Sequence, residues 1–536
     1  MASWWMISII SATLLVSLRP ELGVRQSYVC TTLAFLLVTT VARFLYLVIL
    51  YPKYLTPLRH IPTPPDHERS WIRGNCNFYH LGFPFDEARK WVRTVSNTGF
   101  IRYYAIGNIE RLLVTSPKAL SEILVTKCYH FVRPEVARLQ LAVLAGNGVL
   151  VAEGDEHKAQ RKSLNPSFTY RHIKDLYTVF WSKALELVQV IEKELPAHNG
   201  TVQVRKYSVR AMMDVIGVAG MDYDIGSIKD PNNELRRRYE SLFLTPTIYQ
   251  RFIALMALYV PGFRWLFKIP TRHKRQVAEN INYIRSAASK IVQERKAQLE
   301  EAKATGIDIV SVILKSGTFT DENMVDQIMT FLAAGHETTS SALQWSIYAL
   351  CKYPEVQERL RQEIRNEAST PVTAPVIDSL PYLTAFINEV LRYWPPVPVV
   401  SRQAVRDVVI AGHPIPKGTV INLAAEVTNR DPNLWGPDAD EFKVERWLTP
   451  NGTANNNGGA SSNYAYLTFL HGPRSCIGEK FARGELACFV AALVRKFRMR
   501  LVDENKKLET RTAITKAPVD GVMAKFEVVS DDITNH

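Results

Sequence analysis

The six cysteines of this chain show no paired spacing, and this absence is the first constraint on its class. Paired cysteines at regular intervals would predict a disulfide framework, and none is indicated here. The chain also lacks an internal repeat and, apart from the Gly/Asn-rich segment 451–462, a long polar low-complexity tract. These absences favour a globular catalytic body in a reducing compartment.

The sequence has no nucleic-acid-binding signature, although its formal net charge is +13. The Lys and Arg residues are spread along the chain instead of gathering in one basic segment. A basic surface also suits an anionic membrane or an acidic electron-donor protein. We therefore expect a membrane or protein partner and no nucleic acid.

Charge is nearly absent from residues 28–51, where Arg43 is the only ionised side chain. This run exceeds the roughly 20 residues that cross a bilayer, although a buried core helix is the alternative. A shorter apolar run, Ser3–Leu18, could be a second span, an interfacial helix or part of a signal-anchor, and it lacks the basic start of a cleavable signal peptide. Loop charges leave the topology open. We expect an anchor with one or two hydrophobic segments over 1–51, a Pro-rich hinge over 52–66 and a catalytic domain over 67–536.

Beyond the hinge, the polarity pattern predicts mostly helices with small sheets beside them. Strand patterns at 101–104 and 111–114 predict a hairpin around Gly107 and Asn108. Helices are expected at 321–352, 355–367 and 383–393, and short strands after Trp394. The segment Leu242–Phe267 is rich in aromatic residues, which indicates either core packing or a lid that dips into a membrane.

One cysteine, Cys476, lies in a loop that Gly and Pro punctuate, with Arg474 two residues before it and a helical pattern after it. A thiol at a helix N-terminus beside a cation is expected to have a depressed pKa. Zinc wants four ligands, so a lone thiolate suits a metal that already carries in-plane ligands, as haem iron does. The alternative is a buried free cysteine in a turn.

A second unusual stretch, Ala334-Gly-His-Glu-Thr-Thr339, falls in the middle of the long helix predicted over 321–352. Gly costs about 1 kcal/mol in a helix interior, and Thr is a weak helix former. A Thr hydroxyl can also bond back to the preceding turn and bend the helix. The stretch therefore predicts a local opening or a π-like distortion, which is common at functional sites.

The loop around Cys476, residues 469–478, matches F-x-x-G-x-R-x-C-x-G at every fixed position, and the chain therefore resembles the haem-thiolate cytochrome P450 family. The resemblance implies a mainly α fold with small β-sheets and haem b as cofactor. It makes Cys476 the axial ligand and pairs Arg474 with a haem propionate. It also places Phe469, Gly472 and Gly478 at the cofactor, the two glycines because they allow a close approach to the porphyrin.

The resemblance extends to the oxygen-activation element of the family, A-G-x-[DE]-T-T. By this match Thr338 would hydrogen-bond dioxygen at the haem, and Glu337 would relay protons. A Glu389-x-x-Arg392 pair and Arg446, in Phe-x-x-Glu-Arg-Trp, match the network that locks the cysteine loop in the family. Taken alone, such an i, i+3 pair would be an ordinary surface contact.

A further family element is the W-x-x-x-R clamp for the haem propionates, which this chain matches with one departure. His157 stands in place of the Trp, with Arg161 four residues later, and both His and Trp can donate a ring N–H. Arg402 matches another propionate-binding arginine less specifically. Basic residues expected near the thiolate side of the haem would suit docking of an acidic reductase; they are Lys158, Arg161, Lys162, Lys480, Arg483, Arg495 and Lys496.

The resemblance implies a monooxygenase anchored in the endoplasmic reticulum membrane, with a cytosolic catalytic domain. It would hydroxylate or epoxidise a lipophilic small molecule with O2, and its electrons would come from a separate NADPH-dependent flavoprotein reductase, because the chain contains no flavin or iron–sulfur motif. The anchor and the phrase Tyr54–Pro62 are similar to filamentous-fungal members of natural-product pathways. The alternatives are a fatty-acid or sterol hydroxylase, a reductase-independent isomerase or dehydratase, and a non-enzymatic haem sensor or carrier. Glu337 and Thr338 argue against the last two, since neither needs a proton relay to oxygen.

Overall fold

The computed structural model describes residues 2–24, 27–65, 68–70, 73–76, 83–242, 271–301, 308–367, 373–506, 508–512 and 514–529. The chain divides into two compact units, of which unit 1 comprises Met1–Pro84, Ile101–Leu112 and Leu244–Val277. Unit 2 comprises Phe85–Phe100, Leu113–Phe243 and Ala278–His536. The aromatic-rich segment expected as core or lid lies, after Leu242, outside the described residues.

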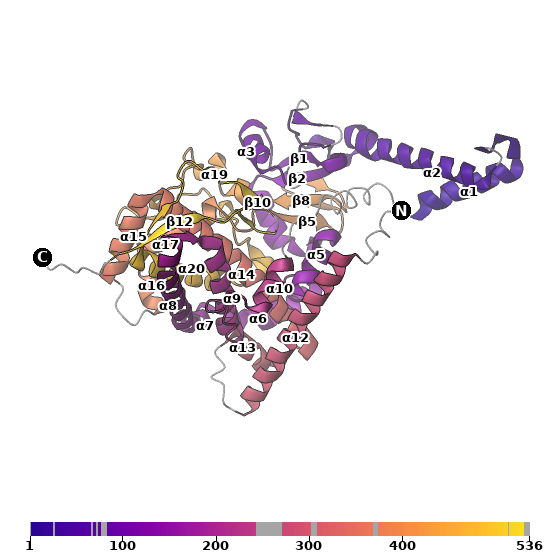
Figure 1. Cartoon of the computed structure of the whole chain (residues 1–536). Coiled ribbons are helices and arrows are strands. Elements are labelled where there is room, and N and C mark those ends of the chain that lie inside the picture. The colour runs from indigo at the N-terminus through magenta and orange to yellow at the C-terminus, as the bar shows by residue number, and fades with distance from the viewer. Residues whose placement is uncertain are drawn as a thin grey trace. The chain divides into compact units, whose positions relative to one another are not determined.

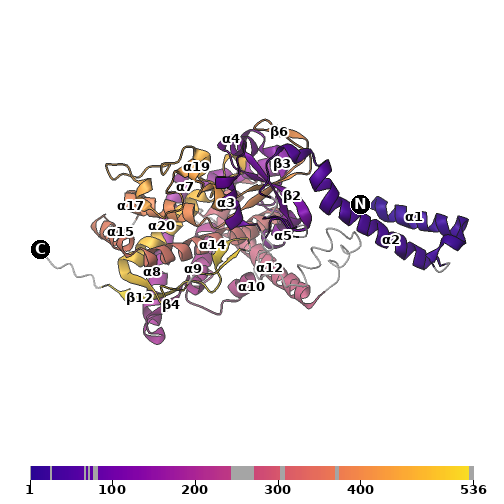
Figure 2. The same cartoon turned by 90° about the horizontal axis from the view of Figure 1, so that it is seen from above.

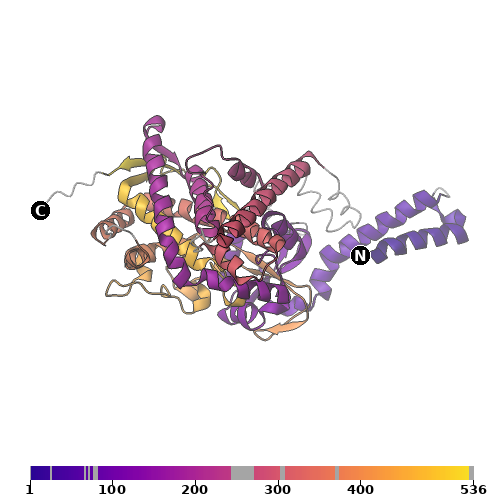
Figure 3. The ribbon, with the colours of Figure 1, turned by 90° about the horizontal axis from the view of Figure 1, so that it is seen from below.

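Unit 1 begins with a pair of apolar helices, α1 (Ala2–Leu18) and α2 (Tyr28–Leu45), which lie side by side in every view (Figure 1, Figure 2 and Figure 3). Ser8 Oγ and Thr39 Oγ1 share a hydrogen bond of 2.8 Å between them. The helix of α2 continues in π-type turns through Tyr46–Leu55. Among the described residues, Tyr28–Leu55 is the helix long and apolar enough to cross a membrane, and 6% of its apolar window is buried.

The rest of unit 1 holds most of a β-hairpin, β1 (Phe100–Ala105) and β2 (Ile109–Val114), as predicted. Its turn needs a left-handed backbone, which Gly107 (φ +71°) and Asn108 (φ +56°) supply. The Arg102 guanidinium and the Thr56 hydroxyl both donate to Glu110, at 2.9 and 2.8 Å. These bonds hold the hairpin to the segment that follows the apolar helix.

The remaining helices make the chain mainly α, as the sequence predicts. The long ones are α8 (Tyr177–Glu194), α9 (Val204–Met221), α12 (Arg272–Glu300), α14 (Asp321–Lys352), α15 (Pro354–Glu367), α17 (Pro381–Tyr393) and α20 (Glu479–Lys496). The short ones are α3 (Phe85–Thr94), α4 (Pro117–Ser121), α5 (Glu135–Ala145), α6 (Gly154–Leu164), α7 (Tyr170–Ile173), α10 (Glu234–Leu242), α13 (Ile309–Ser316), α16 (Ala374–Asp378), α18 (Ala425–Thr428) and α19 (Pro432–Trp435).

Helix α14 organises the core of unit 2 (Figure 1). Its N-cap is Thr320, whose hydroxyl accepts the backbone N–H of Asn323 at 3.3 Å. It packs against α9, α5 and α20, and α20 packs in turn against α8. Side chains such as Leu343, Ile347 and Leu350 are buried on the second half of α14, because that half is surrounded by protein. The Ala334–Thr339 stretch lies in the middle of the helix.

Small antiparallel sheets lie beside the helices. In unit 2, β5 (Val400–Ala404) pairs with β8 (Val420–Leu423) and with β3 (Phe131–Val132), in the registers Val400↔Leu423 and Phe131↔Ala404. A second sheet has the order β4 (Thr201–Gln203), β12 (Met523–Val528), β9 (Phe497–Leu501). Two-stranded ribbons are formed by β6 (Val408–Ile410) with β7 (His413–Ile415), and by β10 (Thr510–Thr512) with β11 (Lys516–Pro518).

Candidate active site

A cavity of about 500 Å³ lies inside unit 2. This volume is within the range of about 300–1,000 Å³ that small-molecule sites occupy. Its wall is made by α5, α6, α14, β5 and the loop before α20, and much of it is apolar, as at Leu141, Leu144, Phe331 and Val397. A ligand in this cavity would be surrounded mostly by hydrocarbon.

The Cys476 loop closes one side of the cavity, and the thiol of Cys476 lines it. The backbone N–H of Cys476 donates to the carbonyl of Phe469 at 2.8 Å, so the loop folds back on itself. Phe469 also lines the cavity, and the Arg483 guanidinium lies 5.0 Å from its ring centre. The backbone N–H of Gly478 hydrogen-bonds to the sulfur, just before α20 begins. The sulfur is therefore presented on a loop that main-chain bonds fix.

The pKa of the Cys476 thiol differs in direction from the sequence expectation. Burial raises this pKa to about 11, against the opposite effects of the Gly478 N–H, Arg161 and Arg483. The sequence predicted a depressed pKa, and this prediction was wrong when the protein groups act without a metal. Desolvation of the thiolate raises the pKa by more than the nearby cations lower it. A metal ion at the sulfur would supply the deprotonation itself, since coordination removes a thiol proton.

The two glycines of the loop have different roles. Gly472 has φ +74°, and a Cβ there would lie 2.2 Å from the Leu124 carbonyl oxygen. Gly472 is not among the residues that line the cavity, and its positive φ and its packing against Leu124 are sufficient to require a glycine. Gly478 lines the cavity, and a Cβ there would meet no protein atom within 4 Å. A side chain at 478 would thus occupy cavity space that a flat cofactor could use.

On the opposite element, Glu337 and Thr338 of α14 line the same cavity. The Thr338 hydroxyl donates to the Ala334 carbonyl at 2.7 Å, and the Thr339 hydroxyl donates to the Gly335 carbonyl at 3.0 Å. These are the back-bonds expected of threonines in a helix. The expected π-like distortion is absent from α14, which is an α-helix from Asp321 to Lys352, because the threonines satisfy the local carbonyls without breaking the helix.

The predicted propionate residues lie in one cluster of cations. Arg474 donates to the Phe131 carbonyl at 3.0 Å and forms an ion pair of 2.5 Å with Glu153. Arg161 donates to the Ser475 carbonyl at 2.6 Å, which ties α6 to the cysteine loop. Both arginines line the cavity. Arg161 is bonded to the residue before Cys476, and Arg474 lies two residues before it, so both charges are fixed beside the cysteine loop.

Arg402 belongs to the same cluster although it does not line the cavity. Its side chain is 3% exposed, and its Nη2 atom is buried without a hydrogen-bond partner. Burial, followed by the charges of Arg133 and Arg474, lowers the pKa of Arg402 well below its usual range. A buried cation with an unsatisfied donor is costly unless an anion completes it.

His157 is buried in the cluster, with Nδ1 at 3.2 Å from the Tyr129 hydroxyl. Burial, then the charges of Arg474 and Arg161, lower the pKa of His157 to about 4. The protein groups alone therefore keep the imidazole neutral at pH 7, able to donate one N–H, as the absent Trp would.

Sequence reasoning missed Arg133, which lines the cavity beside these residues. Its Nε donates to the Leu150 carbonyl at 2.9 Å, and burial lowers its pKa to about 10. The signal was present, because Arg133 is a cation at the start of a stretch that is otherwise mostly apolar. The guanidinium groups of this cluster outnumber the carboxylate of Glu153, so the cluster fits an anionic ligand. The acidic propionates of a haem are such a ligand.

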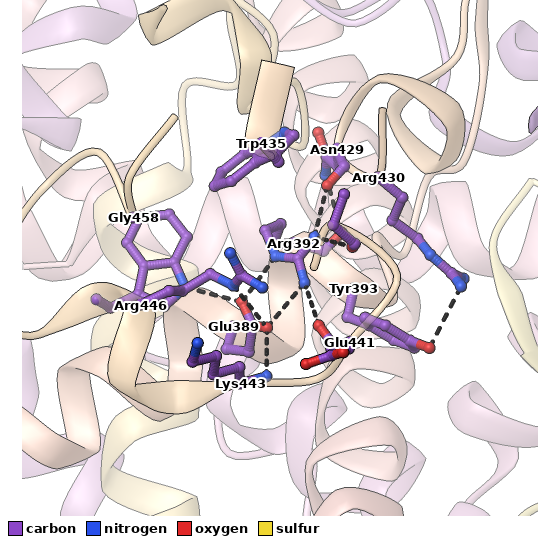
Figure 4. A network of polar contacts seen from close by, with 12 residues as sticks. Glu389, Arg392, Tyr393, Asn429, Arg430, Trp435, Glu441, Lys443, Arg446 and Gly458 are labelled. Carbon is purple, nitrogen blue, oxygen red and sulfur yellow. Dashed lines mark hydrogen bonds and ion pairs between the residues drawn. The ribbon is translucent and has the colours of Figure 1, made fainter. Parts of the chain in front are cut away.

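Behind the cysteine loop, Glu389, Arg392 and Arg446 form a buried network (Figure 4). The Arg446 Nε donates to Glu389 Oε1 at 3.2 Å, and the Trp447 indole N–H donates to Glu389 Oε2 at 2.9 Å. Arg392 also donates to the carbonyl of Asn429 at 2.8 Å. Sequence reasoning missed Trp447 and Asn429, which complete the network.

The Asn429 side chain connects this network to the cysteine loop. Its Oδ1 accepts the backbone N–H of Leu467 at 2.7 Å, and its Nδ2 donates to the Thr468 hydroxyl at 2.8 Å. Leu467 and Thr468 immediately precede Phe469 and also line the cavity. The network therefore fixes the backbone from which the cysteine loop starts.

Comparison with known proteins agrees with this geometry. The family model for cytochrome P450 matches residues 64–522. The chain belongs to the cytochrome P450 family. It is 47% identical over 523 residues to the cytochrome P450 monooxygenase sphH of Aspergillus fumigatus, with 95% of this chain and 96% of the relative covered. It is 41% identical over 483 residues to the cytochrome P450 monooxygenase FSL4 of Gibberella zeae, with 86% of each chain covered.

A third relative, the cytochrome P450 monooxygenase FUM15 of Gibberella moniliformis, is 38% identical over 546 residues, with 91% of this chain and 90% of the relative covered. The protein is thus a cytochrome P450 monooxygenase, and membership of the family implies a haem-thiolate iron cofactor. The cavity fits that group: it has a thiol on its wall, the Gly478 recess, and a cation cluster with an unsatisfied Arg402 donor.

Proposed function

We propose that this cytochrome P450 hydroxylates or epoxidises a lipophilic small molecule, with O2 as co-substrate and electrons from a separate NADPH-dependent flavoprotein reductase. The observation that carries the proposal is the shared cavity, in which the Cys476 thiol and the Glu337–Thr338 pair line one mostly apolar space. An isomerase or dehydratase without O2 chemistry would have no use for an acid and a hydroxyl on that helix.

In this proposal the Cys476 thiolate would bind the iron of haem b. Arg161, Arg402, Arg474 and His157, joined by Arg133, hold the propionates through charge-assisted hydrogen bonds. Phe469 and Gly478 border the porphyrin, while Gly472 shapes the loop from outside the cavity. When bound, a haem with a thiolate ligand supplies the activation of O2 that inserts one oxygen atom into a C–H bond or across a C=C bond.

The protein side chains would control protons and water. Thr338 presents a hydroxyl whose present acceptor is the Ala334 carbonyl, and this hydroxyl can turn toward a ligand in the cavity at the loss of one hydrogen bond. Glu337 can take up and release a proton beside it. The apolar wall limits the water that reaches the site, which protects the reaction from proton leakage.

The substrate class follows from the lining of the cavity, which favours a molecule with a large hydrocarbon surface. We place the enzyme in natural-product biosynthesis, because the relatives described above are fungal monooxygenases and the anchor and hinge are similar in kind to such enzymes. A fatty acid or a sterol is the competing substrate class, and a substrate screen separates them.

We further propose that residues 1–51 anchor the enzyme in the endoplasmic reticulum membrane, that 52–66 form the hinge, and that 67–536 form a catalytic domain in the cytosol. The apolar helix over Tyr28–Leu55 supports the anchor. Among the basic residues expected to dock the reductase, Lys158, Arg483 and Lys496 already pair with acidic side chains within unit 2. Lys162 and Lys480 remain exposed for that contact.

The experiment is to express the full chain in microsomes, reduce it and add carbon monoxide, and then to screen lipophilic compounds with NADPH and a reductase. A strongly red-shifted Soret band together with oxygenated product that requires O2 and NADPH supports the proposal. A Soret band of the histidine-ligated or neutral-thiol type in folded protein would overturn the ligand assignment. A thiolate-type band with product that forms without O2 or NADPH would instead indicate the isomerase or dehydratase class.

A further inference from the structure

Glu337 has a partner from a distant part of the sequence. The hydroxyl of Thr515 donates to Glu337 Oε1 at 3.1 Å, across a sequence separation of 178 residues. Thr515 lies in the turn between β10 and β11, is 6% exposed, and lines the same cavity as Glu337 and Thr338. The Glu337 carboxylate on α14 therefore accepts a hydrogen bond from a hydroxyl in the turn between β10 and β11.

The backbone next to Thr515 is held against α14 by other contacts. The carbonyl of Lys516 accepts the Ser341 hydroxyl at 2.8 Å and the Trp345 indole N–H at 3.0 Å. The backbone N–H of Lys516 donates to the Pro396 carbonyl at 2.9 Å. Ser341 and Trp345 lie about one and two turns after Glu337 on α14, so the start of β11 is fixed relative to the helix.

The side chain of Lys516 adds a further anchor. Its Nζ donates to Glu426 Oε1 at 2.5 Å, and the same Glu426 oxygen accepts Arg89 Nη1 at 2.7 Å. Glu426 is 2% exposed, so this ion pair is sheltered from solvent. The Thr515 hydroxyl is thus not needed to hold the strand, because Lys516 holds it through its main chain and its side chain.

We propose that Thr515 is a positioning residue for the proton relay of this enzyme, acting through Glu337; the inference rests on the oxygenase function proposed above. A glutamate side chain has several rotatable bonds, and ordering it for proton transfer costs rotamer entropy. The Thr515 hydroxyl fixes Oε1, which leaves Oε2 as the oxygen that exchanges a proton. The hydroxyl also stabilises the charged carboxylate that forms each time Glu337 gives its proton away.

The consequence is that the two neighbouring residues of α14 depend on different contacts. Thr338 and Glu337 are adjacent on the helix, and the hydrogen bond from Thr515 sets the side-chain conformation of Glu337. Without the hydroxyl, Glu337 samples other rotamers, and proton delivery slows relative to the loss of reduced oxygen as peroxide. The coupling of NADPH use to product then falls, while the residues that would hold the haem are unchanged.

The test compares Thr515→Val, which keeps the shape and removes the hydroxyl, with Thr515→Ser, which keeps the hydroxyl. Each variant is measured in the reconstituted full-length enzyme for peroxide released per NADPH, product per NADPH and the solvent kinetic isotope effect on product formation. We expect Thr515→Val to raise the ratio of peroxide to product about tenfold and to enlarge the isotope effect, because a hydrogen bond to a charged group is lost. Thr515→Ser should stay within about twofold of wild type.

Ser341→Ala is the matched control, because it removes another hydrogen bond between the same strand and the same helix without touching Glu337. It should leave the coupling near the wild-type value. If Ser341→Ala uncouples as strongly as Thr515→Val, the role of Thr515 is structural and the inference is overturned. Unchanged coupling in Thr515→Val, or failure of Thr515→Ser to restore it, overturns it as well.

Two further readouts keep the outcomes distinct. The carbon monoxide spectrum and the spectral shift on substrate binding should be the same in Thr515→Val and wild type, since neither depends on proton delivery. A wild-type enzyme without a thiolate-type spectrum or without O2-dependent product refutes the proposed function itself. If the wild-type enzyme has a thiolate-type spectrum and forms O2-dependent product, but Thr515→Val is coupled as well as wild type, only the role of Thr515 is refuted.

Discussion

Glu389 and Arg392 form a bidentate ion pair, with Arg392 Nε to Glu389 Oε2 at 2.7 Å and Nη2 to Oε1 at 2.8 Å. Both side chains are fully buried, at 0% exposure. Such a pair is expensive to desolvate and is retained only where further hydrogen bonds complete it. Here the Glu389 carboxylate accepts three further hydrogen bonds, from Arg446, Trp447 and the backbone N–H of Lys443. The pair therefore holds the segment from which the cysteine loop starts.

Glu389→Gln should destabilise the protein strongly. The change keeps the size of the side chain but leaves Arg392 as a buried cation without a carboxylate and Arg446 with Asp438 as its remaining acidic partner, which costs about 3–5 kcal/mol. Because Arg392 and Asn429 lead to Leu467 and the cysteine loop, we expect haem content to fall together with the unfolding midpoint. Thermal unfolding and the haem absorbance per protein measure both.

Glu445→Gln is the control for that experiment. Glu445 directly precedes Arg446 in the sequence and forms an ion pair with Arg359, in which about half of each side chain is exposed. An exposed pair contributes about 0–1 kcal/mol, so the unfolding midpoint and the haem content should change little. Equal effects of Glu389→Gln and Glu445→Gln would show that the buried network has no special role in holding the loop.

Cys476→Ala should abolish the thiolate-type carbon monoxide spectrum, since Cys476 is the cysteine whose sulfur lines the cavity. The matched variant is Cys488→Ala, on the helix α20 that follows the loop, where the thiol is buried in the core. Cys488→Ala should keep the spectrum and lose only a small amount of stability. A thiolate-type band that survives in folded Cys476→Ala protein would contradict the assignment.

The sequence was sufficient for features that short-range chemistry determines. The helix predicted over 321–352 has those bounds in α14, because Thr320 caps its start. Pro354 and Pro381 open α15 and α17 at the first helical turn, where a proline is tolerated, and the helices begin one and two residues before the predicted starts. The residues of the cysteine motif are contiguous, so they were found together without knowledge of the fold.

The parts that were missed depend on contacts between distant segments. Asn429 and Thr515 acquire their roles from partners 37 and 178 residues away, and no local pattern marks them. Trp447 lies in the Phe-x-x-Glu-Arg-Trp segment, but its hydrogen bond to Glu389, 58 residues away, could not be read from that segment. The pKa of Cys476 was predicted in the wrong direction because neighbouring charges can be read from a sequence, whereas the depth of burial cannot. Gly472 was expected at the porphyrin, whereas the backbone carbonyl that a Cβ at this position would meet belongs to Leu124.

Arg402→Met should weaken haem retention. Arg402 has a buried Nη2 without a hydrogen-bond partner, and an anionic group held by the cation cluster would give that donor its missing acceptor. Loss of one charge-assisted hydrogen bond would accelerate haem transfer to an acceptor protein by about tenfold. Arg406→Gln, at an exposed position four residues later, should leave the transfer rate unchanged. A transfer rate of Arg402→Met equal to that of wild type would remove Arg402 from the propionate site.

Thr338→Ala should separate oxygen activation from haem binding. The Thr338 hydroxyl bonds only to the Ala334 carbonyl among the contacts of the described residues, so its removal leaves α14 intact and keeps the haem. A proton donor that lines the cavity is then lost, and general acid catalysis of this kind contributes about 10²–10⁴ in rate. We expect NADPH consumption to continue while product per NADPH falls and peroxide rises. Thr338→Ser should restore part of the coupling, because it returns a hydroxyl to the same turn. If Thr338→Ala is coupled as well as wild type, the proton reaches the site by another route, of which Glu337 and Thr515 are the remaining members.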